Sequence, residues 1–168
     1  FVLDPSSDGF RILGQAADHQ LGNSVSKIGD INGDSKDEII FGAHGNGNQA
    51  AYVVFGGNGA NLDLSANLMP PAMGFKISGE TGWADFGYSV STAGDFNKDG
   101  KPDIIIGAPQ KNGMGAVYVT YGAPGLTTMD LSSTPLSPST TGFRIVGEAS
   151  GEQFGYSVSK AGDINKDT

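Results

Sequence analysis

Oxygen-bearing side chains alternate in one short segment, Asp95-Phe96-Asn97-Lys98-Asp99-Gly100-Lys101-Pro102-Asp103. Carboxylate or amide side chains fill positions 1, 3, 5 and 9, and glycine fills position 6. Alternate residues of an extended turn point the same way, so the first three would converge on one point. Glycine lets the chain fold back, after which the Lys101 carbonyl and the Asp103 carboxylate add further oxygens. Such ligands favour Ca²⁺ over Mg²⁺, which keeps more of its water.

The alternative reading of this segment is an ordinary polar turn, because Asp, Asn and Gly are favoured in turns. Carboxylates ~4 Å apart repel by about 1 kcal/mol in water and about 4 kcal/mol at an effective dielectric of 20. A turn that bound no ion would carry this repulsion in every copy of the loop, so the recurrence favours calcium. A helical EF-hand loop does not fit, because the apolar run Ile104-Ile105-Ile106 follows and reads as a strand.

Two other segments repeat the pattern. In the first copy, positions 1, 3, 5 and 9 are Asp30, Asn32, Asp34 and Glu38. Ser35 replaces the glycine and tolerates positive φ less well, so we expect weaker calcium binding there. The third copy lacks the last ligand positions, so an intact site is not expected. Its residues are Asp163, Asn165 and Asp167.

These loops belong to a longer tandem repeat. Gly9-Phe10-Arg11-Ile12 recurs at residues 74–77 and 142–145, at spacings of 65 and 68 residues. Ser24-Val25-Ser26 recurs with the same two spacings. Between these anchors lie short β-branched and aromatic segments bounded by glycine, such as Tyr52-Val53-Val54-Phe55, which predict strands. No segment shows sustained helical periodicity.

Each unit therefore supplies about four short strands, which is the content of one β-propeller blade. We expect an all-β fold made of such blades, in a ring that is incomplete in this chain because propellers close with ~4–8 blades. Residues 1–20 would end one blade, 21–79 and 86–147 would form two full blades, and 154–168 would start another. Linkers rich in Ser, Thr and Pro, such as residues 131–142, are expected to be solvated connections.

Composition excludes several classes of function. The 168 residues carry 10 Lys+Arg against 18 Asp+Glu, a net charge of −8, which argues against nucleic acid or an anionic membrane as partner. Cysteine is absent, which excludes disulfides, thiolate metal sites and cysteine nucleophiles. The apolar runs are too short for membrane insertion.

Two short motifs flank the acidic loop: Phe86-Gly87 before it and Gly107-Ala108-Pro109 after it. With these motifs in this order, the units resemble the FG-GAP repeats of integrin α-subunit propellers, over nearly the whole chain. The resemblance implies a seven-bladed ring when complete, with calcium between the first and second strands of a blade. The implied ligands are Asp95, Asn97, Asp99, the Lys101 carbonyl and Asp103 for one ion, and Asp30, Asn32, Asp34, the Lys36 carbonyl and Glu38 for another. The spacing adds Asp163, Asn165 and Asp167 as the partial third set.

The resemblance also implies a function. We expect a calcium-stabilised, non-catalytic module of a secreted or cell-surface protein, acting in adhesion, protein interaction or surface structure. Extracellular modules bind calcium at ~10⁻⁴–10⁻³ M. In this family partners meet the face opposite calcium, so a protein or glycan ligand is expected there, and the remaining blades would come from the same or other chains. Candidate residues on that face are His19, His44, Trp83, Gln110 and Lys111.

Two other classes of function stay open. The segment could be an accessory or catalytic propeller of a secreted lipase or polysaccharide-degrading enzyme, although no Gly-x-Ser-x-Gly motif is present. It could instead be a filament-forming or carbohydrate-binding module. Against a repeated sugar pocket, Trp83 aligns with Asp18 and Gly151 in the other units. The absence of cysteine indicates a microbial or protist surface protein more than an animal integrin.

Overall fold

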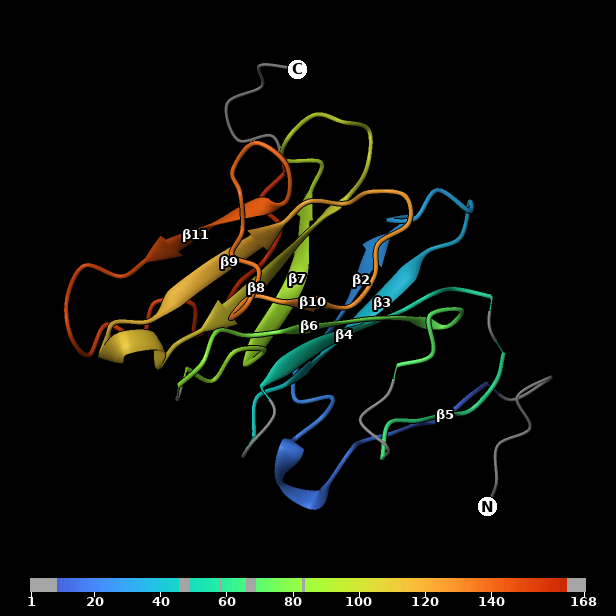
Figure 1. The fold of residues 1–168 in the computed structure, drawn as a ribbon, viewed down its shortest axis with the longest axis horizontal. Coiled ribbons are helices and arrows are strands. Elements are labelled where there is room, and N and C mark those ends of the chain that lie inside the picture. Colours follow the sequence, from blue (N-terminus) through green and yellow to red (C-terminus); the bar gives the residue numbers. More distant parts are fainter. Residues whose placement is uncertain (1–8, 46–48, 58, 66–68, 83, 163–168) are drawn as a thin grey trace.

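The computed structural model describes residues 9–45, 49–57, 59–65, 69–82 and 84–162. Over these ranges the only helical elements are the 3-10 turns η1 (Ala17–His19) and η2 (Lys111–Gly113), and neither is long or apolar enough to cross a membrane (Figure 1). The predicted all-β fold is confirmed. The strands are β1 Ile12–Leu13, β2 Val25–Gly29, β3 Glu38–Ala43, β4 Ala50–Val54, β5 Leu62–Asp63, β6 Gly74–Ser78, β7 Ser89–Gly94, β8 Asp103–Ala108, β9 Ala116–Thr120, β10 Met129–Asp130 and β11 Gly142–Val146.

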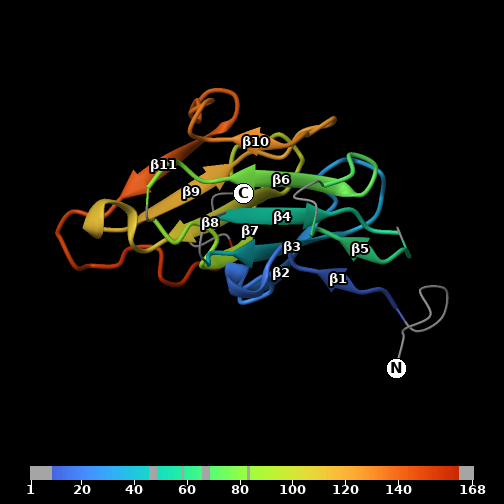
Figure 2. The same cartoon turned by 60° about the horizontal axis from the view of Figure 1, so that its bottom comes forward.

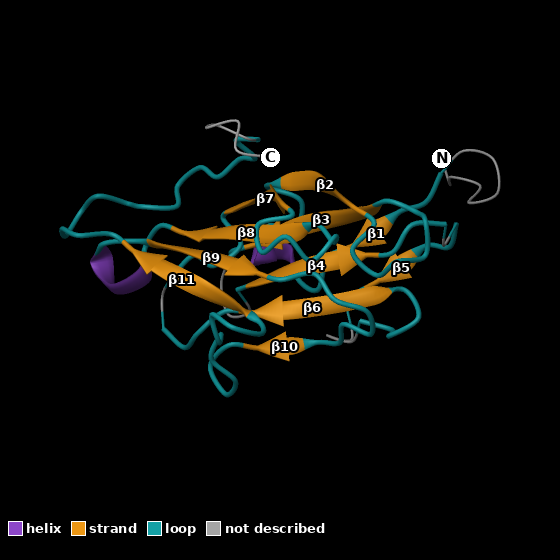
Figure 3. Cartoon of the chain, turned by 90° about the horizontal axis from the view of Figure 1, so that it is seen from above, coloured by secondary structure: helices purple, strands orange, loops and turns teal. Residues whose placement is uncertain are grey.

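Two antiparallel arrays of four strands form the body of the molecule. The first runs β2-β3-β4-β6 and the second runs β7-β8-β9-β11. β2 and β7 lie side by side, so the two sheets stand as neighbouring blades (Figures 1 and 3). The four-stranded blades are as predicted, and the ring is not closed in this chain. The total of seven blades and the blade boundaries stay predictions.

Short linker strands add to the outer edges of the blades. β10 pairs in parallel with β6, and β5 pairs in parallel with β1 (Figure 2). β1 is the counterpart of β6 in the preceding unit, so the two pairings are equivalent. The prediction that the 131–142 linker is merely solvated is wrong at Leu131, which is 2% exposed. An isolated leucine among Ser, Thr and Pro shows no periodicity, and its burial follows from the pairing of β10 with the edge of β6.

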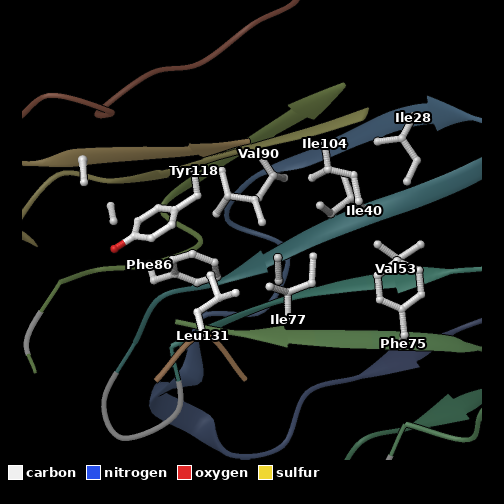
Figure 4. Packing of buried hydrophobic residues seen from close by; sticks show 14 of the residues in the cluster. Ile28, Ile40, Val53, Phe75, Ile77, Phe86, Val90, Ile104, Tyr118 and Leu131 are labelled. Atoms are coloured by element: carbon white, nitrogen blue, oxygen red, sulfur yellow. The ribbon is translucent and has the colours of Figure 1, made fainter. Parts of the chain in front are cut away.

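The main core lies between the two blades. Ile40, Val53 and Ile77 of the first blade pack in one cluster with Ile104 and Ile106 of the second (Figure 4). Most of these side chains come from apolar runs that the sequence marks as strands covered on both faces. The core therefore joins the blades to each other as well as stabilising each sheet.

The glycines of the two flanking motifs meet across the blade junction. A Cβ on Gly42 would lie 1.9 Å from the Gly87 carbonyl oxygen, and a Cβ on Gly107 would lie 1.9 Å from the Gly155 carbonyl oxygen. Any side chain at Gly42 or Gly107 would therefore push the next unit away. This close approach explains why the second motif begins with glycine in both units.

The segment that begins the next unit has no strand within its described residues, 154–162. Phe154 forms one isolated parallel bridge with Gly115. In the two complete blades the first strand pairs with the second strand of its own blade. No such second strand lies in the described part of this unit, which explains why Ser157-Val158-Ser159, the counterpart of the first strand of each complete blade, is unpaired here. The assignment of 154–168 to a further blade stays a prediction.

Candidate metal centre in the acidic loops

Two acidic loops leave the sheets at equivalent places. The first acidic loop (residues 30–38) joins β2 to β3, and the second acidic loop (residues 95–103) joins β7 to β8. The strand register shifts just before each loop, at Gly29 and at Gly94. Both glycines have positive φ, 85° and 75°. Such an irregularity interrupts pairing and redirects the chain, so both loops turn out of the sheet at the same point.

The Asp30 carboxylate organises the first acidic loop. It accepts hydrogen bonds from the backbone amides of Gly33 (2.6 Å), Asp34 (3.0 Å) and Ser35 (2.8 Å). Desolvation opposes ionisation of Asp30, but these amides and the charge of Lys101 outweigh it and lower the pKa of Asp30. The loop thus wraps around an ionised carboxylate.

Two more carboxylates converge on Asp30. One oxygen each from Asp30, Asp34 and Glu38 lies within 4.8 Å of the other two. Glu38 is fully buried, and its carboxylate accepts hydrogen bonds from the amides of Ile31 (2.7 Å) and Gly56 (3.4 Å). Burial nevertheless raises the pKa of Glu38, and the charges of Asp34 and Asp30 add to that rise. A divalent cation at this point would relieve both the desolvation and the repulsion.

The second acidic loop begins in the same way. Asp95 accepts hydrogen bonds from the amides of Asp99 (2.9 Å) and Gly100 (2.9 Å). Asn97 Oδ1 also accepts a bond from the Asp99 amide (3.1 Å), and the Asn97 side-chain amide donates to the Asp99 carboxylate (2.8 Å). These short-range bonds link the side chains of alternate residues within the turn; their role as metal ligands stays a prediction.

Asp103 ends the second acidic loop as a buried carboxylate. It accepts hydrogen bonds from the amides of Phe96 (2.7 Å), Asn97 (3.3 Å) and Gly122 (2.8 Å). Burial raises its pKa in spite of these donors. Because Gly122 follows β9, Asp103 ties the loop to a second hairpin, as Glu38 does through Gly56 in the first blade. The position-9 carboxylate therefore has a structural role in addition to any metal.

The two loops differ in how closely the carboxylates approach. Among the described residues, only the first acidic loop brings three carboxylates within 4.8 Å of one another. Glu38 has one more methylene than Asp103, which extends its carboxylate toward the other two. The prediction that the first loop binds calcium more weakly rests on Ser35 and on the extra methylene of Glu38, and this closer cluster argues in the opposite direction.

Comparison with known proteins decides what these repeats are. The family model described as FG-GAP repeat matches residues 86–120. Human integrin alpha-7 is 31% identical over 99% of this chain and 13% of its own length. The chain is an integrin alpha-like FG-GAP repeat domain. The family model covers both glycine motifs and the second acidic loop, and the integrin alpha-7 match extends over the first acidic loop as well. The resemblance expected from the motifs is confirmed.

Other relatives extend the comparison. Integrin alpha pat-2 of Caenorhabditis elegans is 33% identical over 61% of this chain and 9% of its own length. The phosphatidylinositol-glycan-specific phospholipase D of Rattus norvegicus is 32% identical over 59% of this chain and 13% of its own length. The FG-GAP chain spans about a tenth of the length of these curated relatives.

Of the remaining predicted ligands, some lie in the two acidic loops and the others lie outside the described residues. Lys36 and Lys101 occupy position 7, where their backbone amides donate to Asp34 (2.9 Å) and Asp99 (2.9 Å). Asn32 Oδ1 accepts a bond from the Asp34 amide (2.8 Å). The third-loop residues Asp163, Asn165 and Asp167 lie outside the described residues, and so does the predicted contact Trp83.

The loops between β3 and β4 and between β8 and β9 lie at the strand ends away from the acidic loops, where partner contacts are predicted. There the His44 ring packs on Tyr88 with centroids 4.7 Å apart, and Tyr88 packs on Tyr156 at the same distance. Sequence reasoning did not single out these tyrosines. The signal available was that both follow the Phe-Gly motif of their own unit.

Proposed function

We propose that this domain is a calcium-stabilised part of an FG-GAP propeller that acts outside the cell in adhesion or protein interaction and has no catalytic role of its own. The convergence of Asp30, Asp34 and Glu38 within 4.8 Å is the observation that carries the proposal. Three carboxylates with a nearby amide oxygen form the hard donor set that Ca²⁺ takes. The integrin relatives support the adhesion or interaction role.

Calcium in this proposal has a structural role. The side chains of Asp30, Asn32, Asp34 and Glu38, with the Lys36 carbonyl, would hold one ion, and the equivalent residues of the second acidic loop would hold another. A bound cation supplies charge that offsets the mutual repulsion of the loop carboxylates. Because it binds the folded chain only, calcium at about 100 times its Kd adds about 2.7 kcal/mol of stability.

Thermal unfolding in calcium, in magnesium and in chelator tests the proposal. One site near saturation predicts a calcium-specific rise in Tm of roughly 5–10 °C for a chain of this size. Asp34→Asn and Asp99→Asn should each reduce the rise. Asp18→Asn is the matched control, because it removes the same charge from an exposed residue of η1. An equal rise in magnesium, or none in calcium, would refute the proposal.

Location and partners follow as further parts of the proposal. We assign the domain to a secreted or cell-surface protein, with a protein or glycan ligand on the face opposite the acidic loops and with further blades from the same or other chains. The phospholipase D relative favours a second candidate, in which the domain is an accessory propeller of a secreted enzyme. An assay for phospholipid hydrolysis by the whole protein would separate the two.

A further inference from the structure

A cavity of about 480 Å³ lies between the two complete blades. Its volume is in the range of small-molecule pockets. Glu80 lines it from the segment after β6, Tyr118 from β9, Arg144 from β11 and Lys111 from η2. The linker after β10 supplies an apolar wall that includes Leu131 and Leu136. The described lining residues all lie between the end of β6 and β11, within the part of the chain that forms the two complete blades.

The cavity opens at the end of the blades opposite the acidic loops. The second acidic loop precedes β8, whereas the η2 turn that carries Lys111 follows it. Ser78, at the end of β6, pairs with Ala50, at the start of β4, which places Glu80 at that same end of the first blade. The cavity is therefore on the face where a partner is proposed.

The charged groups of the cavity leave one positive charge in excess. The Lys111 ammonium lies 2.7 Å from Glu80 Oε2, and Arg144 Nη1 pairs with Glu80 Oε1. Burial opposes ionisation of Glu80, but Lys111 and Arg144 outweigh it and lower the pKa of Glu80. The Lys111 side chain is only 10% exposed. Two cations with eight N–H donors between them thus share one carboxylate, in a chain whose net charge is −8.

A buried hydroxyl adds another donor. Tyr118 is 1% exposed, with its ring edge-on to Phe86 at 5.1 Å and its hydroxyl pointing away from the isoleucines of the core (Figure 4). No described residue makes a hydrogen bond of standard geometry with this hydroxyl, although Glu80 and Arg144 lie close enough to influence it. Burial, followed by the charge of Glu80, raises the pKa of Tyr118 to about 12. It therefore stays protonated and able to donate.

The fold itself does not require this group of charges. In the first blade the equivalent tyrosine, Tyr52, also faces a basic residue, Lys76, across the paired strands. At the places of Glu80 and Lys111, however, the sequence of the first unit has Gln15 and Asn46. The tyrosine and the basic residue are thus common to both blades, whereas the first unit lacks the Glu–Lys pair; the glutamate itself recurs one repeat later as Glu148.

We propose that this cavity binds the carboxylate of an acidic side chain from a protein partner. Lys111, Arg144 and the Tyr118 hydroxyl would donate to it, and Leu131 and Leu136 would contact its carbon chain. Glu80 acts as a positioning residue that holds the two cations toward the cavity. The inference deepens the proposed interaction function by giving its partner a chemistry.

A ¹H–¹⁵N NMR titration with N-acetyl-glutamate amide tests the inference, with N-acetyl-glutamine amide as the uncharged probe. The acidic probe alone should give saturable shifts at the amides of Thr81, Lys111 and Arg144. Tyr118→Phe, which keeps the ring, and Arg144→Gln should each weaken binding, the latter by about tenfold or more because a charged hydrogen bond is lost. Arg11→Gln is the matched control, since Arg11 holds the place of Arg144 in another unit and lies outside the cavity.

Several results would overturn the inference. Equal shifts with both probes, shifts that do not saturate, or equal loss of binding in Arg11→Gln and Arg144→Gln would each do so. Tighter binding of glucuronate than of the acidic amino-acid probe would overturn the assignment to a protein side chain. The titration is run in calcium and again in chelator with the fold monitored, so failure here is distinguishable from failure of the calcium proposal.

Discussion

Positions 4 and 6 of both acidic loops hold residues in left-handed backbone conformation. In the first loop these are Gly33 (φ 84°) and Ser35 (φ 68°), and in the second they are Lys98 (φ 60°) and Gly100 (φ 85°). Each loop therefore has glycine at one of the two positions and a residue with a side chain at the other. The residue with a side chain, Ser35 or Lys98, is strained, because the left-handed conformation costs an L-residue about 1–2 kcal/mol.

Ser35→Gly should relieve that strain. The gain is partly offset by the greater freedom of glycine in the unfolded chain, so we expect the free energy of unfolding to rise by about 0.5–1 kcal/mol. Urea denaturation in chelator measures it without a contribution from metal. Gly100→Ser is the reverse control and should lower the free energy by a similar amount; a stabilising Gly100→Ser would contradict the argument.

At the scale of the elements, the blades are held in place by backbone that approaches backbone. The Gly42 of β3 lies against the carbonyl of Gly87, which precedes β7. The same contact recurs between Gly107 and Gly155. Hydrophobic side chains fill the rest of the junction, but at these two points there is no room for even one methyl group.

Gly42→Ala should therefore destabilise the protein by about 3 kcal/mol, because the new Cβ overlaps a backbone oxygen that cannot rotate away. The urea midpoint measures the loss. Gly125→Ala is the control: Gly125 has φ 72° and open space around it, so alanine there costs only the backbone strain of about 1 kcal/mol. Equal losses at the two positions would show that close packing at the junction is not the cause.

At the scale of the whole molecule, one face of the second blade is exposed where the same face of the first is buried. Ile77 of β6 is fully buried under the second blade. Ile145 holds the same place in β11 and is 47% exposed. Phe96 is likewise 59% exposed, whereas its counterpart Ile31 is fully buried. The difference follows from the neighbour that the first blade has and the second lacks in this chain.

The same substitution at these two places should give unequal effects. Ile77→Ala should lower the free energy of unfolding by about 2–5 kcal/mol, as expected for a buried isoleucine. Ile145→Ala should cost less than about 1 kcal/mol in this chain, because much of its side chain is already in water. Urea denaturation of the two variants makes the comparison. Equal losses would mean that the exposed face is covered in solution.

Much of this architecture is readable from the sequence, and the rest depends on distant contacts. The blade strands follow from β-branched runs, and the acidic loops follow from their oxygen spacing. Burial of Leu131 could not be predicted, since it arises when a linker pairs with a strand some 50 residues earlier. Glu80, Lys111 and Arg144 are likewise separated in sequence, and only the packing of two blades brings them together.

The contact between Gly42 and Gly87 has a consequence for how such genes change length. Gly42 of the first unit contacts Gly87 of the second, and Gly107 of the second unit contacts Gly155 of the third in the same way. The contact between neighbouring units is therefore the same at each junction. Deletion or duplication of one repeat period, wherever its boundaries fall, would bring Gly42 against the glycine of a later unit in an unchanged setting. This local contact would thus survive the gain or loss of a whole repeat, whereas a change of half a period would disrupt it at once.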